Sequence, residues 1–124
     1  MKAKDIIQYE TTNENTILLI VNKSVCRVFE VSAFWLSKHI PMKKLYNKYS
    51  RSLNTRMIYA WFSARRLNKV LDDLQAEGFR PITQKDGYIV LKKEGAKLEG
   101  YDEWKEKVFD GVMVEQAYTM EKVW

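Results

Sequence analysis

Residues 16–31 read TILLIVNKSVCRVFEV, and this stretch decides the fold. Its first part, 16–21, is an apolar and partly β-branched run of strand length, which predicts a buried strand. The polar residues 22–24 have the composition of a tight turn. Residues 25–31 return as a second strand, in which successive side chains point to opposite faces. Together the three segments predict a β-hairpin.

Helices are expected on both sides of this hairpin. Residues 3–10 predict a short helix before it. After it, Ser32 has the side chain of a helix N-cap, and this second helix should end near His39 because Pro41 stops it. The segment 42–54 is basic and carries tyrosines. Its pattern fits either an irregular helix or a surface loop, and the residues do not decide between them.

The apolar run 57–62 predicts a further strand, buried between its neighbours. A helix over 63–77 follows, begun by Ser63 and carrying apolar residues at the spacing of a core-facing stripe. Gly78 stands where a left-handed C-terminal cap is expected. The hairpin after it is centred on Asp86-Gly87, and Pro81 places its first strand at a sheet edge or at a bulge.

These elements predict an α/β (α+β) fold, a mixed β-sheet of about five strands with helices packed on it. We divide the chain into an α/β domain, 1–94, and a C-terminal extension, 95–124. The extension begins with a linker and contains a short amphipathic helix over 101–109. It ends in an apolar tail, which either docks on a partner or folds back on the sheet.

The composition limits the classes of protein to which this chain can belong. The chain has 124 residues, of which 46% are hydrophobic, so it is expected to form one folded unit with a real core. It has a single cysteine, which excludes an internal disulfide and favours a reduced, cytoplasmic protein. No apolar run reaches the roughly 20 residues of a membrane span, and the N-terminus lacks the apolar core of a signal peptide.

Charge is segregated along the chain. Residues 31–71, here called the basic block, contain nine Lys or Arg and no Asp or Glu. Residues 1–30 balance to zero and 72–124 come to −4, so the net charge of +5 originates in the basic block. A surface usually mixes both signs. A long acid-free stretch with interleaved aromatics therefore favours a polyanionic partner, although charge runs are often only solvated surface.

The helix predicted over 63–77 opposes its own dipole. Arg65 and Arg66 occupy its first turn, while Asp72, Asp73 and Glu77 occupy its second half. Each such placement costs about 0.3–1 kcal/mol when little screened. A phosphate bound at the helix N-terminus would turn the repulsion into attraction. The alternative is two exposed arginines that are screened by salt or paired with the acidic tail.

We therefore predict a nucleic-acid site on the two flanks of strand 57–62, which should form one face. Basic side chains would contact phosphates and two tyrosines would stack on bases. The residues are Lys43, Lys44, Tyr46, Lys48, Tyr49, Arg51, Arg56, Arg65, Arg66 and Lys69. Partner contacts are predicted for Tyr118, Met120 and Trp124 in the apolar tail.

Catalytic chemistry is not indicated. The sequence has neither common type of glycine-rich phosphate loop and no Cys/His constellation with metal spacing. We predict no catalytic residues, no metal, no cofactor and no small-molecule substrate. A small enzyme is the remaining alternative, and it would need His39 or Cys26 at a pocket.

The order of elements resembles the N-terminal, mismatch-recognition domain of the DNA-repair protein MutS. Residues 18–31 look like its strand and turn, and 67–84 look like its helix followed by a glycine-aromatic-basic strand ending in Gln84. The likeness covers about residues 3–92. At the position of the family's mismatch-probing motif the chain has residues 24–28, Ser-Val-Cys-Arg-Val, without the wedging Phe or the Glu. Mismatch recognition is therefore not implied.

The resemblance implies a stand-alone MutS-like protein. Small proteins of this kind are accessory factors beside reverse transcriptases of diversity-generating retroelements. We accordingly expect a non-enzymatic nucleic-acid-binding accessory protein that partners a reverse transcriptase or other polymerase and its RNA or DNA. The alternative is a phage or mobile-element protein that binds and modulates an acidic protein surface.

Overall fold

The computed structural model describes residues 1–40, 45–51 and 54–109. The predicted site residues Lys43 and Lys44 and the tail residues Tyr118, Met120 and Trp124 lie outside this part. In chain order the elements are α1 (Ala3–Thr11), β1 (Thr16–Val21), β2 (Val25–Phe29), α2 (Glu30–His39), β3 (Tyr46–Ser50), β4 (Thr55–Ser63), the 3-10 turn η1 (Ala64–Arg66), α3 (Leu67–Ala76), β5 (Arg80–Lys85), β6 (Tyr88–Lys92) and α4 (Tyr101–Phe109).

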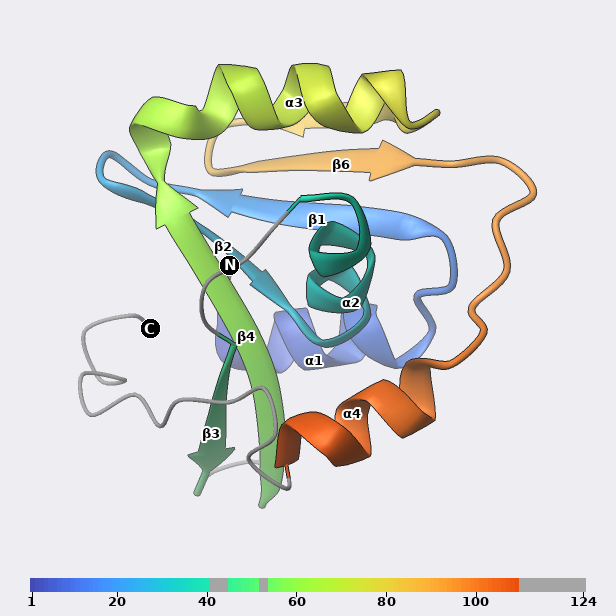
Figure 1. Ribbon diagram of the computed structural model, residues 1–124. Coiled ribbons are helices and arrows are strands. Elements are labelled where there is room, and N and C mark those ends of the chain that lie inside the picture. Colours follow the sequence, from blue (N-terminus) through green and yellow to red (C-terminus); the bar gives the residue numbers. More distant parts are fainter. Residues whose placement is uncertain (41–44, 52–53, 110–124) are drawn as a thin grey trace.

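The strands form one 6-stranded sheet in the order β3-β4-β2-β1-β6-β5 (Figure 1). The α+β class is confirmed, with one strand more than expected. All five strand pairs are antiparallel rather than mixed. The reason is topological, because strands joined through a helix, β2 with β3 and β4 with β5, are not neighbours. A parallel pair would need such a crossover between adjacent strands.

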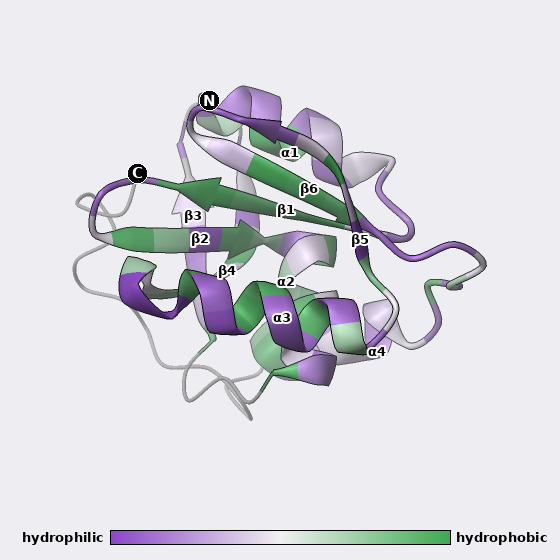
Figure 2. Ribbon diagram, turned by 90° about the horizontal axis from the view of Figure 1, so that it is seen from above, coloured by the Kyte–Doolittle hydropathy of each residue, from purple (hydrophilic) through white to green (hydrophobic). Residues whose placement is uncertain are grey.

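Helices cover both faces of the sheet. Figure 2 shows α1 on one side, and α2, α3 and α4 on the other. The larger core lies under the three helices and includes Phe34 of α2, Leu74 of α3 and Val108 of α4. The smaller core lies under α1, where Ile6 packs with side chains of β1, β2, β4 and β6, among them Tyr59. We call these the three-helix face and the α1 face.

Local patterns predicted most elements well. The helices over 3–10 and 101–109 and both hairpins are confirmed. Gly78 has the expected positive φ of +100° after α3. β5, which contains Pro81, is an edge strand and also has a register shift between Pro81 and Thr83.

The sequence pattern of 42–54 fits a helix or a loop, whereas most of its described part is a strand, β3. β3 pairs along its length with β4, from Tyr46 opposite Tyr59 to Ser50 opposite Thr55. Residues 46–50 have no alternating apolar pattern that would specify a strand by themselves, so their register is fixed by the strand they pair with. The pairing is thus set by β4 and not by the composition of 46–50.

Two predicted boundaries are wrong. β2 ends at Phe29 and α2 begins at Glu30, so Ser32 lies inside the first turn and does not cap the helix. Its hydroxyl is engaged elsewhere, since it accepts from the Leu18 N–H at 2.9 Å. The helix predicted over 63–77 starts as the turn η1, and α3 proper begins at Leu67. Ser63 does cap this entry, because its hydroxyl accepts from the Arg65 N–H at 3.3 Å.

Candidate functional site

Three connecting segments meet at one end of the sheet, where β1, β4 and β5 end. The Ala64 N–H donates to the Ser24 carbonyl at 2.9 Å, which joins η1 to the β1–β2 turn. The Val21 N–H donates to the Gly87 carbonyl at 2.8 Å, which joins the end of β1 to the β5–β6 turn. Both turns and η1 therefore lie side by side at this end (Figure 1).

Five cations gather at this end, which we call the basic end. They come from the β1–β2 turn, β2, η1 and β5, and are Lys23, Arg27, Arg65, Arg66 and Lys85. In both turns and η1, Asp86 is the one acidic residue. Within the described part of the chain, no ion pair joins an acidic side chain to Lys23, Arg65, Arg66 or Lys85, and all four are exposed.

An exposed tryptophan stands beside the basic end. Trp61 of β4 lies directly opposite Arg27 of β2, and Arg27 in turn lies opposite Ile20 of β1. Ile20 is paired with Tyr88 of β6, so the four side chains form a row across the α1 face. The exposed fraction of Trp61 is 42%. We predicted the strand 57–62 to be wholly buried, and at Trp61 this is wrong because the residue is not in the core under α1.

The sheet register places the predicted site residues of β3 on two opposite faces of the sheet. Tyr46 and Lys48 pair with Tyr59 and Met57, which belong to the core of the α1 face. Tyr49 pairs with Arg56, and both lie on the opposite face because alternate strand residues point to opposite sides. Tyr46 and Tyr49 therefore cannot stack on one nucleic-acid strand from the same face. Tyr46 instead stacks on Tyr59, with ring centroids 5.2 Å apart.

The two flanks of β4 do not form one face. Arg51 and Arg56 are exposed at the start of β4, whereas Arg65, Arg66 and Lys69 follow its end. The two groups lie at opposite ends of β4 (Figure 1). With 9 residues, β4 spans about 30 Å. Lys69 also pairs with Asp73 at 3.6 Å, one turn along α3.

The unfavourable interaction of Arg65 and Arg66 with the helix dipole is weaker than the sequence suggests. Arg65 belongs to η1 and Arg66 is the N-cap of α3, so both cations precede the first α-helical turn. That first turn contains no acidic residue. The predicted pairing of these arginines with the acidic tail falls outside the described residues.

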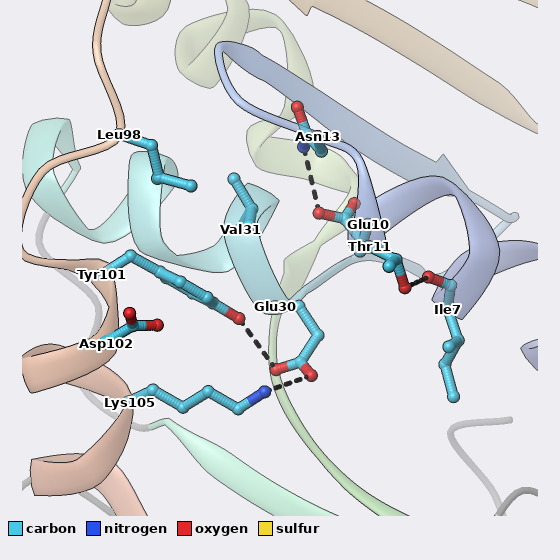
Figure 3. Close-up of a pocket in the computed structure, with 10 residues that line it drawn as sticks. All are labelled: Ile7, Glu10, Thr11, Asn13, Glu30, Val31, Leu98, Tyr101, Asp102 and Lys105. Atoms are coloured by element: carbon cyan, nitrogen blue, oxygen red, sulfur yellow. Dashed lines mark hydrogen bonds and ion pairs between the residues drawn. The ribbon is translucent and has the colours of Figure 1, made fainter.

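A pocket of about 390 Å³ lies between α1, α2 and α4, and it contains a carboxyl group that we did not predict (Figure 3). Glu10 is buried, with 4% of its surface exposed. It accepts from the Ser32 N–H at 3.0 Å, the Ser32 hydroxyl at 2.6 Å and the Asn13 amide at 3.0 Å. Burial raises the pKa of the Glu10 carboxyl to about 7, although these hydrogen bonds lower it. Its position four residues after buried Ile6, on the same helix face, was the available signal.

A second carboxylate in the pocket is held by α4. Glu30 accepts from the Lys105 ammonium at 2.8 Å and from the Tyr101 hydroxyl at 3.3 Å (Figure 3). It also accepts from the Ile58 N–H at 3.2 Å. The polar groups of Glu10 and Glu30 thus already have partners within the fold. These contacts explain how α1, α2 and α4 are held together and do not require a ligand.

The two residues that a small enzyme would need are poorly placed for nucleophilic chemistry. Cys26 is fully buried in β2, and burial raises the pKa of its thiol. His39 packs on the Phe79 ring, and its Nδ1 lies 3.6 Å from Glu77 Oε2. Burial lowers the pKa of His39 despite that carboxylate. A reactive cysteine needs the opposite environment, one that lowers the thiol pKa.

Comparisons of this chain with protein-family models, curated proteins and solved structures find no match. The resemblance to the N-terminal MutS domain therefore stays a prediction that rests on the residues quoted above. None of the helices in the described ranges is long and apolar enough to span a bilayer. No group of three or more His, Cys, Asp or Glu placed to hold a metal is found among the same residues.

Proposed function

We propose that this chain is a non-enzymatic nucleic-acid-binding accessory protein whose main phosphate-binding surface is the basic end. One observation carries the proposal. Connecting segments distant in sequence bring Lys23, Arg65, Arg66 and Lys85 together, and none of them pairs with an acidic side chain among the described residues. Such a patch attracts a polyanion through release of its condensed counterions.

This surface revises the predicted site. Arg65 and Arg66 remain in it, joined by Lys23, Arg27 and Lys85, which lie outside the basic block. The exposed arginines beside β3, Arg51 and Arg56, would form a separate, secondary phosphate contact, and Tyr49 is not part of the revised site. The predicted partnership with a reverse transcriptase or other polymerase, and a cytoplasmic location, are part of the same proposal and rest on the sequence.

A salt titration tests the proposal. The full chain should bind a labelled oligonucleotide with a log–log salt slope equal to about −0.7 or −0.9 per phosphate neutralised, for single strands and duplexes respectively. Arg65→Glu with Arg66→Glu should weaken binding and reduce the magnitude of that slope. Lys97→Glu with Lys107→Glu changes the net charge equally at two exposed sites away from the basic end and should have much less effect.

Two results would contradict the proposal: a slope near zero for the wild type, or equal losses in the two double variants. Purification without nuclease adds an independent check. Co-purifying nucleic acid supports the proposal. A chain free of nucleic acid that captures an acidic protein would instead favour the alternative, a modulator of an acidic protein surface.

A further inference from the structure

Helix α1 leaves part of one row of its sheet face outside the core that it covers, since Ile20 of that row is buried in the core while Trp61 is exposed. The core under α1 includes Leu18, Phe29 and Tyr59, which lie on adjacent strands in one row. The next row toward the basic end contains Arg27 and Trp61. Trp61 is the most exposed of the described tryptophans, and neither it nor Arg27 packs in that core. The Trp61–Arg27 part of this row is therefore open to a ligand, whereas Ile20 in the same row is buried.

The row combines the side chains that stack on nucleobases. Trp61 and Arg27 are cross-strand neighbours, whose Cβ atoms are about 4.5–5.5 Å apart in antiparallel pairs. Tyr88 of β6 is half-buried and packs against the core under α1, and Lys85 of β5 lies opposite it at the end of the row. Indole, phenol and guanidinium planes all stack on unpaired bases, and stacking tolerates any base because each has a π-face.

The charge around the row indicates what kind of ligand it binds. No acidic residue is present in β2, β3 or β4. The exposed cations Lys23 and Arg65 lie beside the row, just past the ends of β1 and β4, in the β1–β2 turn and in η1. Bases in a single strand can unstack and offer their faces to aromatic rings and guanidinium planes. Bases in a duplex are stacked on one another and do not offer those faces.

We propose that Trp61, Arg27 and Tyr88 form a base-stacking row for single-stranded nucleic acid, with phosphates directed to the basic end. This inference rests on the proposed function and adds to it a ligand class and a face of the sheet. Tyr49 supplies a matched control. It is also an exposed aromatic, at 51%, on the neighbouring strand β3, but it lies on the opposite face.

The experiment measures anisotropy of labelled single-stranded oligouridylate and oligothymidylate of about 15 nucleotides, with a duplex of the same length. The proteins are the full chain and its Trp61→Ala, Trp61→Phe and Tyr49→Ala variants. Trp61→Ala should weaken single-strand binding about tenfold, and Trp61→Phe should retain most of the affinity. Because stacking releases no counterions, the salt slope of Trp61→Ala should stay that of the wild type. Tyr49→Ala should bind as the wild type does.

The outcomes separate this inference from the proposed function. The stacking row is overturned if Trp61→Ala binds single strands as tightly as the wild type, or if Tyr49→Ala loses as much as Trp61→Ala. In either case the proposed function survives as long as Arg65→Glu with Arg66→Glu still weakens binding. If the wild type binds none of the three probes, the proposed function itself fails. Thermal melts of each variant, with Trp61→Phe keeping an aromatic ring, exclude unfolding as the cause of a loss.

Discussion

Lys105 of α4 contacts Glu30, the residue at which β2 turns into α2, with 2.8 Å between Nζ and Oε1. Glu30 has a positive φ of 47°, which is uncommon for a residue with a side chain. Its second carboxylate oxygen accepts from the Ile58 N–H of β4. One carboxylate thus ties the strained strand-to-helix junction to β4 and to α4. A strained conformation persists only where its surroundings hold it in place.

Removing either partner should destabilise the fold by different amounts. Glu30→Ala leaves the partly buried Lys105 and the Ile58 N–H without their acceptor, and we expect a loss of about 2 kcal/mol in the free energy of unfolding. Lys105→Met keeps the apolar stem, and Glu30 keeps its other donors, so about 1 kcal/mol is expected. Lys107→Met, exposed on the same helix, should change little. Urea denaturation midpoints check these values, and equal effects at Lys105 and Lys107 would refute the role of the pair.

Glu10 should make stability depend on pH. Its pKa in the folded chain, about 7, lies above the ordinary value of 4.5 for this side chain, so the folded state holds the proton more tightly. The stability this provides is fully present below pH 4.5 and is lost as the pH rises through about 7. The total is on the order of 3 kcal/mol. Glu10→Gln has no such titration, so its free energy of unfolding should rise relative to the wild type over that interval.

Urea melts of both proteins at several pH values measure the difference. The sign is the critical result. If the wild type instead gains stability relative to Glu10→Gln as the pH rises through 7, then Glu10 is ionised in the folded state and its burial does not control the pKa.

The hairpins were predictable because their determinants are local. In each, a turn of two or three suitable residues joins the strands, of which β1, β2 and β6 are largely apolar and β5 is mostly polar and exposed. The period-two pattern then fixes which side chains share a face. β3 was not predictable in this way. Residues 46–50 are mostly polar, and they become a strand only because the free edge of β4 pairs with them.

The candidate site was partly predictable for the same reason. Arg65 and Arg66 were found from their charge and their place at a helix start. Arg27 and Trp61 are 34 positions apart in sequence, and only the register of β2 against β4 makes them neighbours. Trp61 was expected to be buried because its run is apolar. Which residue of such a run stays exposed depends on how much of the sheet face α1 covers. The apolar run itself does not encode the extent of that cover.

Phe34 should be the residue of α2 that is most sensitive to truncation. Its ring lies 5.4 Å from the Trp35 ring, 5.6 Å from Tyr101 and 5.4 Å from Trp104, so it joins α2 to α4. Phe34→Ala should cost about 3–5 kcal/mol, because it leaves a cavity among aromatic rings. Phe34→Leu should cost clearly less. Near-ultraviolet circular dichroism should lose intensity in the alanine variant. An unchanged spectrum and denaturation midpoint would show that α4 does not depend on this contact.

Cys26 gives a direct test of the alternative that the chain is a small enzyme. It is the single cysteine, it is fully buried in β2, and burial raises the pKa of its thiol. Because the thiolate is the reactive form, the native chain should react with a thiol reagent such as DTNB only through opening of the fold. We expect labelling at neutral pH to be at least about a hundredfold slower in buffer than in denaturant, in which the same cysteine serves as its own control. Stabilising conditions should slow native labelling further. Labelling of the native chain as fast as that of the denatured chain would show an accessible, reactive thiol, and it would return Cys26 to the list of candidate nucleophiles.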